Sequence, residues 1–147
     1  PGIEHRSRMR VVGEGDAGWG GGPPGDLYVF ISVRDHEFFR REGLDLSCVL
    51  PVTFSQAALG AELQLRSPHG SERIKIPPGT QSGEIIRLKA KGVPSLNGFG
   101  RGDLFVRVVV RTPVRPPREA KKLLKQLAAS GGDALSKEDQ ALLEKMQ

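Results

Sequence analysis

The sequence has only one cysteine and no long apolar run. Cys48 lies in the apolar segment 44–52, where it cannot form an internal disulfide and is expected to be a small buried side chain. We therefore expect a reducing compartment and a cytoplasmic location. No apolar stretch approaches the roughly 20 residues that a membrane-spanning helix needs, so no membrane association is expected.

The first residues also lack the features of a natural start. They contain neither an initiator methionine nor the basic-then-apolar layout of a secretion signal. We therefore expect that the sequence has been cut from a longer protein. Its 147 residues are enough for one moderate core or two small ones, because domains commonly have on the order of 100 to 150 residues.

Patterns for metal binding and catalysis are missing as well. The three histidines lie on different segments beside a single cysteine, whereas a zinc site needs about four clustered ligands. Segment 13–18 matches the glycine-rich dinucleotide-binding pattern, but the helix and the parallel β-α-β unit that should surround it are missing. Asp26 and Asp103 precede strands, where a role in a turn is expected. No candidate nucleophile is paired with a general base, so we expect this chain to be no enzyme and to bind no cofactor.

The net charge of +5 is one requirement for binding nucleic acid, because Lys and Arg side chains neutralise phosphates. One basic cluster lies in the C-terminal part and consists of Arg115, Arg118, Lys121, Lys122 and Lys125. Elsewhere the basic residues alternate with apolar ones, which is typical of the solvated face of a strand. We therefore expect no nucleic-acid partner and keep such binding only as a minor alternative.

The chain contains an internal repeat at an offset of 77 residues, as from Gly25 to Gly102. The matching segments are Pro1-Gly2 with Pro78-Gly79, Arg10-Val11 with Arg87-Leu88, Gly15 with Gly92, and Gly25–Val29 with Gly102–Val106. The pattern continues from segment 31–34 to segment 108–111 without a gap. One architecture is therefore expected to occur twice.

The repeat predicts where the modules begin and end. The second copy begins near Leu44, well before Pro78, whereas nothing comparable precedes Pro1. We expect residues 1–43 to be the second half of a first β module, residues 44–114 a second β module and residues 115–147 a helical segment. The first module is therefore expected to be incomplete at its N-terminus. Half a sandwich would leave unpaired strand edges exposed, so the missing half must lie upstream in the native protein or be supplied otherwise.

Alternating apolar residues predict a mainly β fold. Leu27, Val29, Ile31 and Val33 follow the period of two that a half-buried strand requires, and segment 104–110 repeats the pattern. Further strands are predicted at 9–12, 46–52, 62–66, 73–76 and 85–89. Segment 55–59 is expected to be a short helical turn with Thr53 or Ser55 as its N-cap and Gly60 at its end.

After Pro113 the composition becomes helical, with Pro116 and Pro117 suited to a helix start. Ala120, Leu123, Leu124 and Leu127 have the i, i+3, i+4, i+7 spacing of one apolar stripe, and the helix should end at Gly131-Gly132. A second short helix is predicted over 136–146 with Ser136 as its cap. Helices this short are marginal alone, so the stripe needs a partner, which is either its own module or a second chain.

An ordered set of motifs carries a resemblance to a known family. The motifs are Arg8–Val11, Gly13-Glu-Gly, Gly21–Val29, His36–Gly43, Gln56–Gly60, Ile76–Gly83, Lys91–Pro94 and Gly102–Leu104. Together they resemble the C-terminal client-binding and dimerisation region of bacterial DnaJ-type (J-domain) co-chaperones. The resemblance covers about residues 1–127, and the ordered set is specific although each motif alone is weak.

The resemblance implies two tandem β-sandwich or barrel-like modules of the DnaJ C-terminal type, followed by C-terminal α-helices. It implies that Phe39, in the His-x-x-Phe segment, lines a pocket for hydrophobic segments of unfolded client proteins. A plain core position for Phe39 is the alternative, and alternation places one of Phe38 and Phe39 inward and the other outward. Met9 and Val11 are weaker candidates for the same wall.

The resemblance also implies partners. The stripe of Leu123, Leu124 and Leu127 would pair two protomers as a homodimer, and clients would pass to the seventy-kilodalton heat-shock chaperone. The J domain that stimulates that chaperone is not in this sequence, and zinc is expected only in a cysteine-rich module upstream. The leading hypothesis is a noncatalytic client-binding dimer, in which two weak sites act together. The alternative is a purely structural dimerisation module.

Overall fold

Two antiparallel hairpins in the computed structural model, which describes residues 2–146, form the repeated part of the fold. The first pairs β1 (Ser7–Val11) with β2 (Leu27–Ile31), and the second pairs β7 (Ile85–Leu88) with β8 (Leu104–Arg111). Met9 lies opposite Val29 in the first hairpin, and Ile86 lies opposite Val106 in the second. Met9 and Ile86 are 77 positions apart, and so are their partners Val29 and Val106. The repeat predicted from the sequence is therefore present in the strand register.

The loops of the two hairpins repeat as well. The amide of Gly15 donates to the carbonyl of Gly25 at 2.8 Å, and Gly92 donates to Gly102 at the same distance of 2.8 Å. The first loop contains a short 3-10 turn, η1 (Trp19–Gly21). Equivalent backbone hydrogen bonds at equivalent positions show that the similarity extends beyond the strands.

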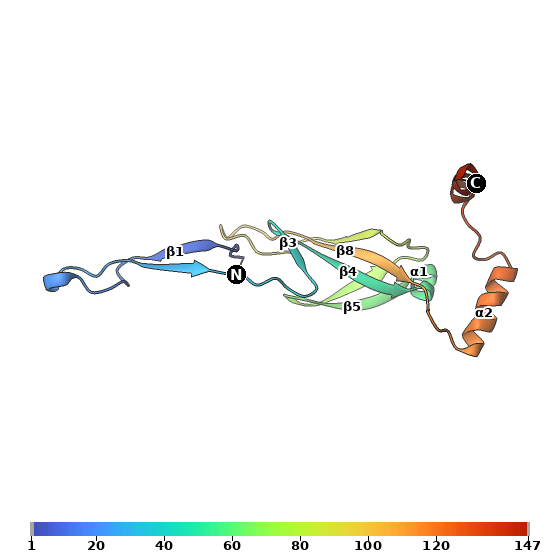
Figure 1. The fold of residues 1–147 in the computed structure, drawn as a ribbon, viewed down its shortest axis with the longest axis horizontal. Helices are drawn as coiled ribbons and strands as arrows, with labels where there is room; N and C mark the ends of the chain where they lie inside the picture. Colours follow the sequence, from blue (N-terminus) through green and yellow to red (C-terminus); the bar gives the residue numbers. More distant parts are fainter. Residues whose placement is uncertain (1, 147) are drawn as a thin grey trace. The chain divides into compact units, whose positions relative to one another are not determined.

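The second hairpin belongs to a four-stranded sheet with the order β3-β4-β8-β7. Strand β3 (Arg40–Glu42) is antiparallel to β4 (Asp45–Thr53), and β4 is parallel to β8 from Leu46 to Thr53. Parallel strands need a long crossover, and here the connection contains helix α1 (Phe54–Leu59) and the hairpin of β5 (Ala61–Ser67) and β6 (Gly70–Ile76). Figure 1 shows β4 and β8 side by side.

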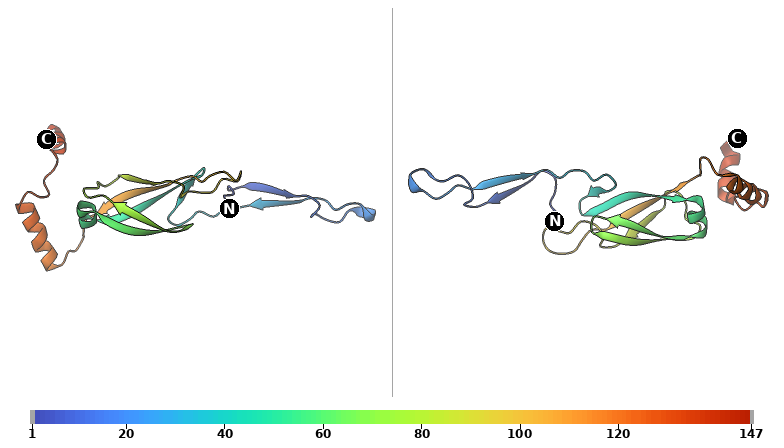
Figure 2. Two further views of the ribbon diagram at one scale, coloured as in Figure 1. Left: turned by 180° about the vertical axis from the view of Figure 1, so that it is seen from behind. Right: turned by 90° about the horizontal axis from the view of Figure 1, so that it is seen from below.

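The core lies between the four-stranded sheet and the β5–β6 hairpin, which form two layers in Figure 2. Five of its side chains are almost completely buried: Ile74, Ile76, Leu104, Val106 and Val108. Ile74 and Ile76 come from β6 and the other three from β8, so alternate residues of both strands point to the same interior. This packing is the two-layered β module that the sequence predicted.

Helix α1 closes one end of this module and is capped as predicted. The Thr53 hydroxyl accepts the amide hydrogen of Gln56, and the Gln56 side chain accepts that of Thr53, which is a complete capping box. Gly60 follows the helix with a φ of 82°, a left-handed value that favours glycine. The sequence alone left Thr53 and Ser55 as alternative caps, and the geometry selects Thr53.

The chain divides into two units, with the border between Arg111 and Thr112. The second unit contains α2 (Arg118–Ala129) and α3 (Lys137–Met146), both predicted from the sequence. The Ser136 hydroxyl accepts the amide hydrogen of Asp139, as expected for a cap. Within residues 2–146 no helix is long and apolar enough to cross a membrane.

The predicted module borders can now be placed on the structure. The border between residues 43 and 44 falls in the tight turn between β3 and β4, so β3 and Phe39 are part of the second module's sheet and core. Strand pairing is the reason, because β3 has β4 as its only partner strand among the described residues. Residues 1 and 147, at the ends of the first and last predicted segments, lie outside the described residues.

Candidate functional site

The predicted site residues Met9 and Val11 lie on one face of the β1–β2 hairpin. Their register places them beside the apolar residues Leu27, Val29 and Ile31 of β2. Met9 is 49% exposed although it sits in the middle of this apolar face. The face therefore presents a strip of aliphatic side chains that is only partly covered.

The repeat shows how open this face is. Its β2 residues Leu27, Val29 and Ile31 correspond to Leu104, Val106 and Val108, the fully buried core of the second module. In that module α1 and the β5–β6 hairpin complete the enclosure of the equivalent face. Among residues 2–146 nothing equivalent covers this face of the first hairpin, and the cover would belong to the half module that the sequence predicts upstream.

One edge of β2 is accessible as well. Strand β8 has β7 on one side and β4 on the other, whereas β2 has only β1 as its partner among the described residues. An unpaired strand edge presents N–H and C=O groups that can pair with another extended chain. The open face and the open edge therefore meet on the same strand.

The opposite face of the hairpin is polar and aromatic. The Arg8 guanidinium lies 5.3 Å from the centre of the Tyr28 ring, and Arg10 forms an ion pair with Asp26. Phe30 also projects on this side and is well exposed. The two faces thus differ in chemistry, and the aliphatic face is the better candidate for apolar segments.

The structure places Phe39 away from Met9 and Val11. Phe39 is 6% exposed and packs in the core of the second module, a cluster that contains no described residue of β1 or β2. Phe38 points the other way and is 66% exposed. The predicted alternation of the two phenylalanines is therefore confirmed, whereas a contact between Phe39 and a client stays a prediction.

His36 fixes the orientation of this pair. Its Nδ1 accepts the amide hydrogens of Phe38 at 3.1 Å and of Phe39 at 3.4 Å, and its ring meets the Phe39 ring edge-on at 5.1 Å. The two hydrogen bonds form a local turn from His36 to Phe39, and the ring contact holds the Phe39 side chain toward the interior. The His-x-x-Phe motif accordingly acts here as a local structural unit.

Arg41 connects the segment before β1 to the second module. Its guanidinium donates to the carbonyl of Ile3 at 2.7 Å and to that of Gly2 at 2.9 Å, and its Nε donates to Gly43 at 2.7 Å. Arginine suits this role because its donors are arranged in a rigid planar fork. The segment before β1 is thus held to the second module through the backbone carbonyls of Gly2 and Ile3.

A groove on the outer face of the four-stranded sheet was not predicted. It has a volume of about 510 Å³ and we call it the outer groove. It is lined by Glu37, Phe38, Arg40, Ser47, Cys48, Val49, Ile85, Phe105 and Arg107. Strand alternation could have revealed it, because Ser47, Val49, Phe105 and Arg107 occupy the positions between core residues.

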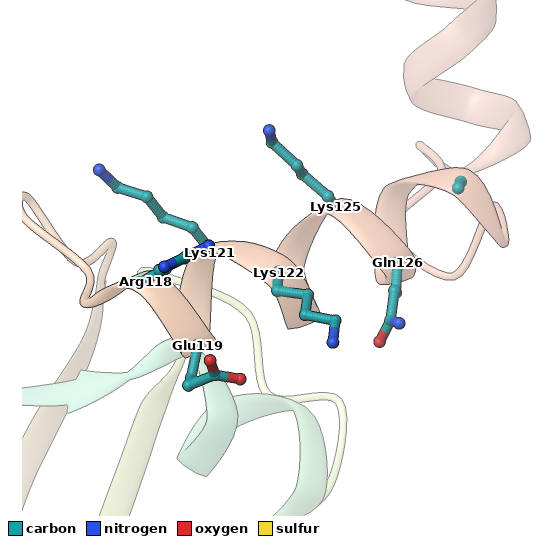
Figure 3. A pocket seen from close by; sticks show the side chains of 7 residues that line it. Arg118, Glu119, Lys121, Lys122, Lys125 and Gln126 are labelled. Carbon is teal, nitrogen blue, oxygen red and sulfur yellow. The ribbon is translucent and has the colours of Figure 1, made fainter.

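Helix α2 has two opposite faces. Leu123, Leu124 and Leu127 share one face as predicted, and Leu123 is 64% exposed. The other face carries four basic residues: Arg118, Lys121, Lys122 and Lys125. Figure 3 shows the basic side chains along a shallow surface of this helix. The leucines are therefore accessible for packing. A partner helix that packs on the leucine face would leave the basic residues of the opposite face in solvent.

Metal chemistry has no support among the described residues, since no three His, Cys, Asp or Glu side chains of 2–146 could hold a metal ion together. Burial raises the pKa of the Cys48 thiol, which favours the neutral form. Cys48 is therefore a buried core side chain, as expected, and no step is assigned to a metal.

Fold and surfaces together define a class of protein: a duplicated β-hairpin architecture with one aliphatic face left open and a separate amphipathic helix. A model of the DnaJ C terminal domain matches residues 1–113. The chain is 46% identical to chaperone protein DnaJ of Brevibacillus choshinensis, over 99% of this chain and 40% of that protein. It is 49% identical to chaperone protein DnaJ of Bacillus cytotoxicus, over 86% of this chain and 35% of that protein.

The chain therefore belongs to the DnaJ C-terminal domain family. It spans about 35% to 40% of the length of these two relatives. The family assignment confirms the resemblance that the ordered motifs gave.

Proposed function

We propose that this chain is the client-binding and dimerising part of a cytoplasmic DnaJ-type co-chaperone. In this proposal it holds apolar segments of unfolded proteins without catalysing a reaction. The observation that carries the proposal is the match of residues 1–113 to the DnaJ C terminal domain, and the aliphatic face of the β1–β2 hairpin is the candidate client surface. Similarity to chaperone proteins named DnaJ supports the same assignment.

The physical basis is the combination of an open face with an open strand edge. An extended client segment can add to a strand edge of the first module through backbone hydrogen bonds, which do not depend on the client's sequence. Every second side chain of that segment then meets the aliphatic face beside Met9 and Val11. Burying one Leu or Phe side chain contributes roughly 1.5 to 3 kcal/mol, so a few such contacts give weak but general binding.

Dimerisation would strengthen this weak binding. We propose that Leu123, Leu124 and Leu127 of α2 pack against a second copy of the chain, because short amphipathic helices are marginal alone. Two client sites in one dimer can engage the same unfolded protein, so its release requires both to open. Hand-over to the seventy-kilodalton heat-shock chaperone would use a J domain elsewhere in the full protein.

Binding of an unfolded protein tests the proposal. The probe is fluorescently labelled, reduced and carboxymethylated α-lactalbumin, which stays unfolded, and fluorescence anisotropy measures its dissociation constant. The variant Met9→Glu, Leu27→Glu puts two charges on the aliphatic face, and we expect at least about tenfold weaker binding because those charges must lose water.

The matched control is Phe30→Glu, which adds a charge to the opposite face of the same hairpin. We expect its dissociation constant to stay within about twofold of the wild-type value. A purely structural dimerisation module is the competing function, favoured by the exposed leucines of α2. No binding of the unfolded probe by a wild-type dimer would select that function instead.

A further inference from the structure

We propose that the outer groove is a second binding surface, whose ligand is an extended peptide with carboxylate side chains next to large apolar ones. The groove lies on the solvent side of the β3-β4-β8-β7 sheet. Phe39 lies within the core on the other side of that sheet, and the aliphatic face with Met9 and Val11 is on β1 and β2. This surface is therefore distinct from the proposed client site.

The strand register builds the floor of the groove. Val49 of β4 lies opposite Arg107 of β8, and Arg107 lies opposite Ile85 of β7. The neighbouring row contains Arg40, Ser47 and Phe105 in register. Neighbouring strands are about 4.8 Å apart, so Arg107 lies directly between two apolar side chains, whereas Ser47 separates Arg40 from Phe105.

The floor is unusually exposed for apolar residues on a sheet. Val49 is 58% exposed and Ile85 is 56% exposed, and the exposed Phe38 ring also lines the groove. Large apolar side chains gathered in one depression indicate a surface that a partner covers. A volume of about 510 Å³ is enough for two or three amino-acid side chains.

The charge of the lining determines the chemistry of the partner. Arg40 and Arg107 form no ion pair with any described residue, whereas Arg87 at the margin is neutralised by Asp103. Glu37 is the one acidic residue among those that line the groove. Two guanidinium groups with unused donors beside an apolar floor complement carboxylates, which arginine binds in a bidentate geometry.

An extended peptide fits these features better than a compact ligand. Every second side chain of such a peptide points to the same face, at a spacing of about 7 Å, so an acidic and an apolar side chain two residues apart can reach neighbouring rows of the floor. The basic and apolar residues of the groove also come from all four strands, which is the breadth an extended segment covers. We therefore infer a peptide with the pattern acidic–x–apolar–x–acidic, where x faces solvent.

The test uses the whole 147-residue chain and a fluorescein-labelled peptide, Gly-Glu-Ser-Phe-Ser-Glu-Gly, followed by fluorescence anisotropy. The variant Arg40→Glu, Arg107→Glu should bind this peptide at least about tenfold more weakly, because two attractive charges become repulsive. The matched control is Arg66→Glu, Arg73→Glu, which makes the same change in net charge on the exposed side of β5 and β6. Its affinity should stay within about twofold of wild type.

A second variant tests the apolar part. Phe38→Ala removes an exposed ring and leaves the core unchanged, so it should weaken peptide binding about fivefold with an unchanged circular dichroism melting curve. The variant Met9→Glu, Leu27→Glu should bind the acidic peptide as wild type does. This comparison separates failure of the outer groove from failure of the proposed client site.

Three results would overturn the inference. Equal affinity of the wild-type chain for the same peptide with Lys in place of Glu would remove the charge argument. Equal affinity of the Arg40→Glu, Arg107→Glu variant and wild type would place the peptide elsewhere. Displacement of the peptide by a twelve-nucleotide oligothymidylate at equal molar concentration would identify the surface as a phosphate-binding one.

Discussion

Asp103 and Arg87 form an ion pair at the start of the second hairpin loop, and Asp26 and Arg10 form the same pair in the first hairpin. The second carboxylate oxygen of Asp103 accepts the amide hydrogen of Ala90 at 2.8 Å, and that of Asp26 accepts the amide hydrogen of Gly13 at 3.0 Å. Both aspartates thus fasten the loop to the strand, which is more than the turn role that the sequence predicted.

This contact makes the stability of the fold depend on pH. The hydrogen bond from Ala90, then the one from Arg87, holds the pKa of Asp103 below its ordinary value of 3.8. The stabilisation is fully present above pH 3.8 and is lost as the pH falls through the lower pKa of the folded state. We expect Asp103→Asn to be less stable than wild type at pH 6 and the difference to shrink toward pH 3.

Urea unfolding followed by circular dichroism between pH 3 and pH 6 measures this difference. Glu14→Gln removes one carboxyl charge from an exposed position of the first hairpin loop and serves as the control for a general charge effect. A stability difference between Asp103→Asn and wild type that stays constant over the whole pH range would contradict the pKa shift.

The opposite orientation of Phe38 and Phe39 predicts unequal effects of the same substitution. Phe39→Ala opens a cavity in the core and should lower the free energy of unfolding by about 3 to 5 kcal/mol. Phe38→Ala removes an exposed ring and should change it by less than about 0.5 kcal/mol. Urea titrations of both variants measure the two values, and similar losses would show that the assigned orientations are wrong.

Two equivalent glycines are predicted to tolerate alanine differently. A Cβ at Gly102 would lie 2.1 Å from the Leu44 carbonyl oxygen, whereas at Gly25 the nearest atom would be 3.8 Å away, on Asp16. Gly102→Ala therefore forces the backbone before β4 to move and should cost about 1 to 3 kcal/mol. Gly25→Ala should change the free energy of unfolding by less than about 1 kcal/mol. Thermal melts of the two variants provide the comparison, and equal melting temperatures would refute it.

Dimer formation is predicted to depend on the leucine face of α2. Leu123→Asp, Leu127→Asp places charges on that face and should turn a dimer into a monomer in sedimentation velocity experiments. Lys122→Asp, on the opposite face, serves as the control and should leave the sedimentation coefficient unchanged. A wild-type chain that is monomeric at all concentrations would instead assign the leucine face to packing within its own chain.

The sequence predicted the repeated parts of the fold well, because they rest on local signals. Alternation located the strands, and the constant offset from Gly25 to Gly102 predicted the duplicated hairpin. The parallel pairing of β4 with β8 could not be predicted, since Leu46 and its partner Leu104 are 58 positions apart and no local pattern encodes such a contact.

The predicted site residues were harder to place for the same reason. Alternation requires Phe38 and Phe39 to point in opposite directions, but only the hydrogen bonds of His36 and the core around Phe39 decide which ring is buried. The outer groove depends on side chains from four strands, and the sequence does not show that Val49 and Ile85 flank Arg107. Long-range register was therefore the missing information.

The most direct test of the proposed client site is methyl NMR of the chain labelled at Met, Ile, Leu and Val methyl groups. Reduced and carboxymethylated α-lactalbumin is titrated into the sample. The account predicts that the largest shifts occur at Met9, Val11, Leu27, Val29 and Ile31. Shifts confined to Leu123, Leu124 and Leu127, with the β1–β2 hairpin unchanged, would contradict it.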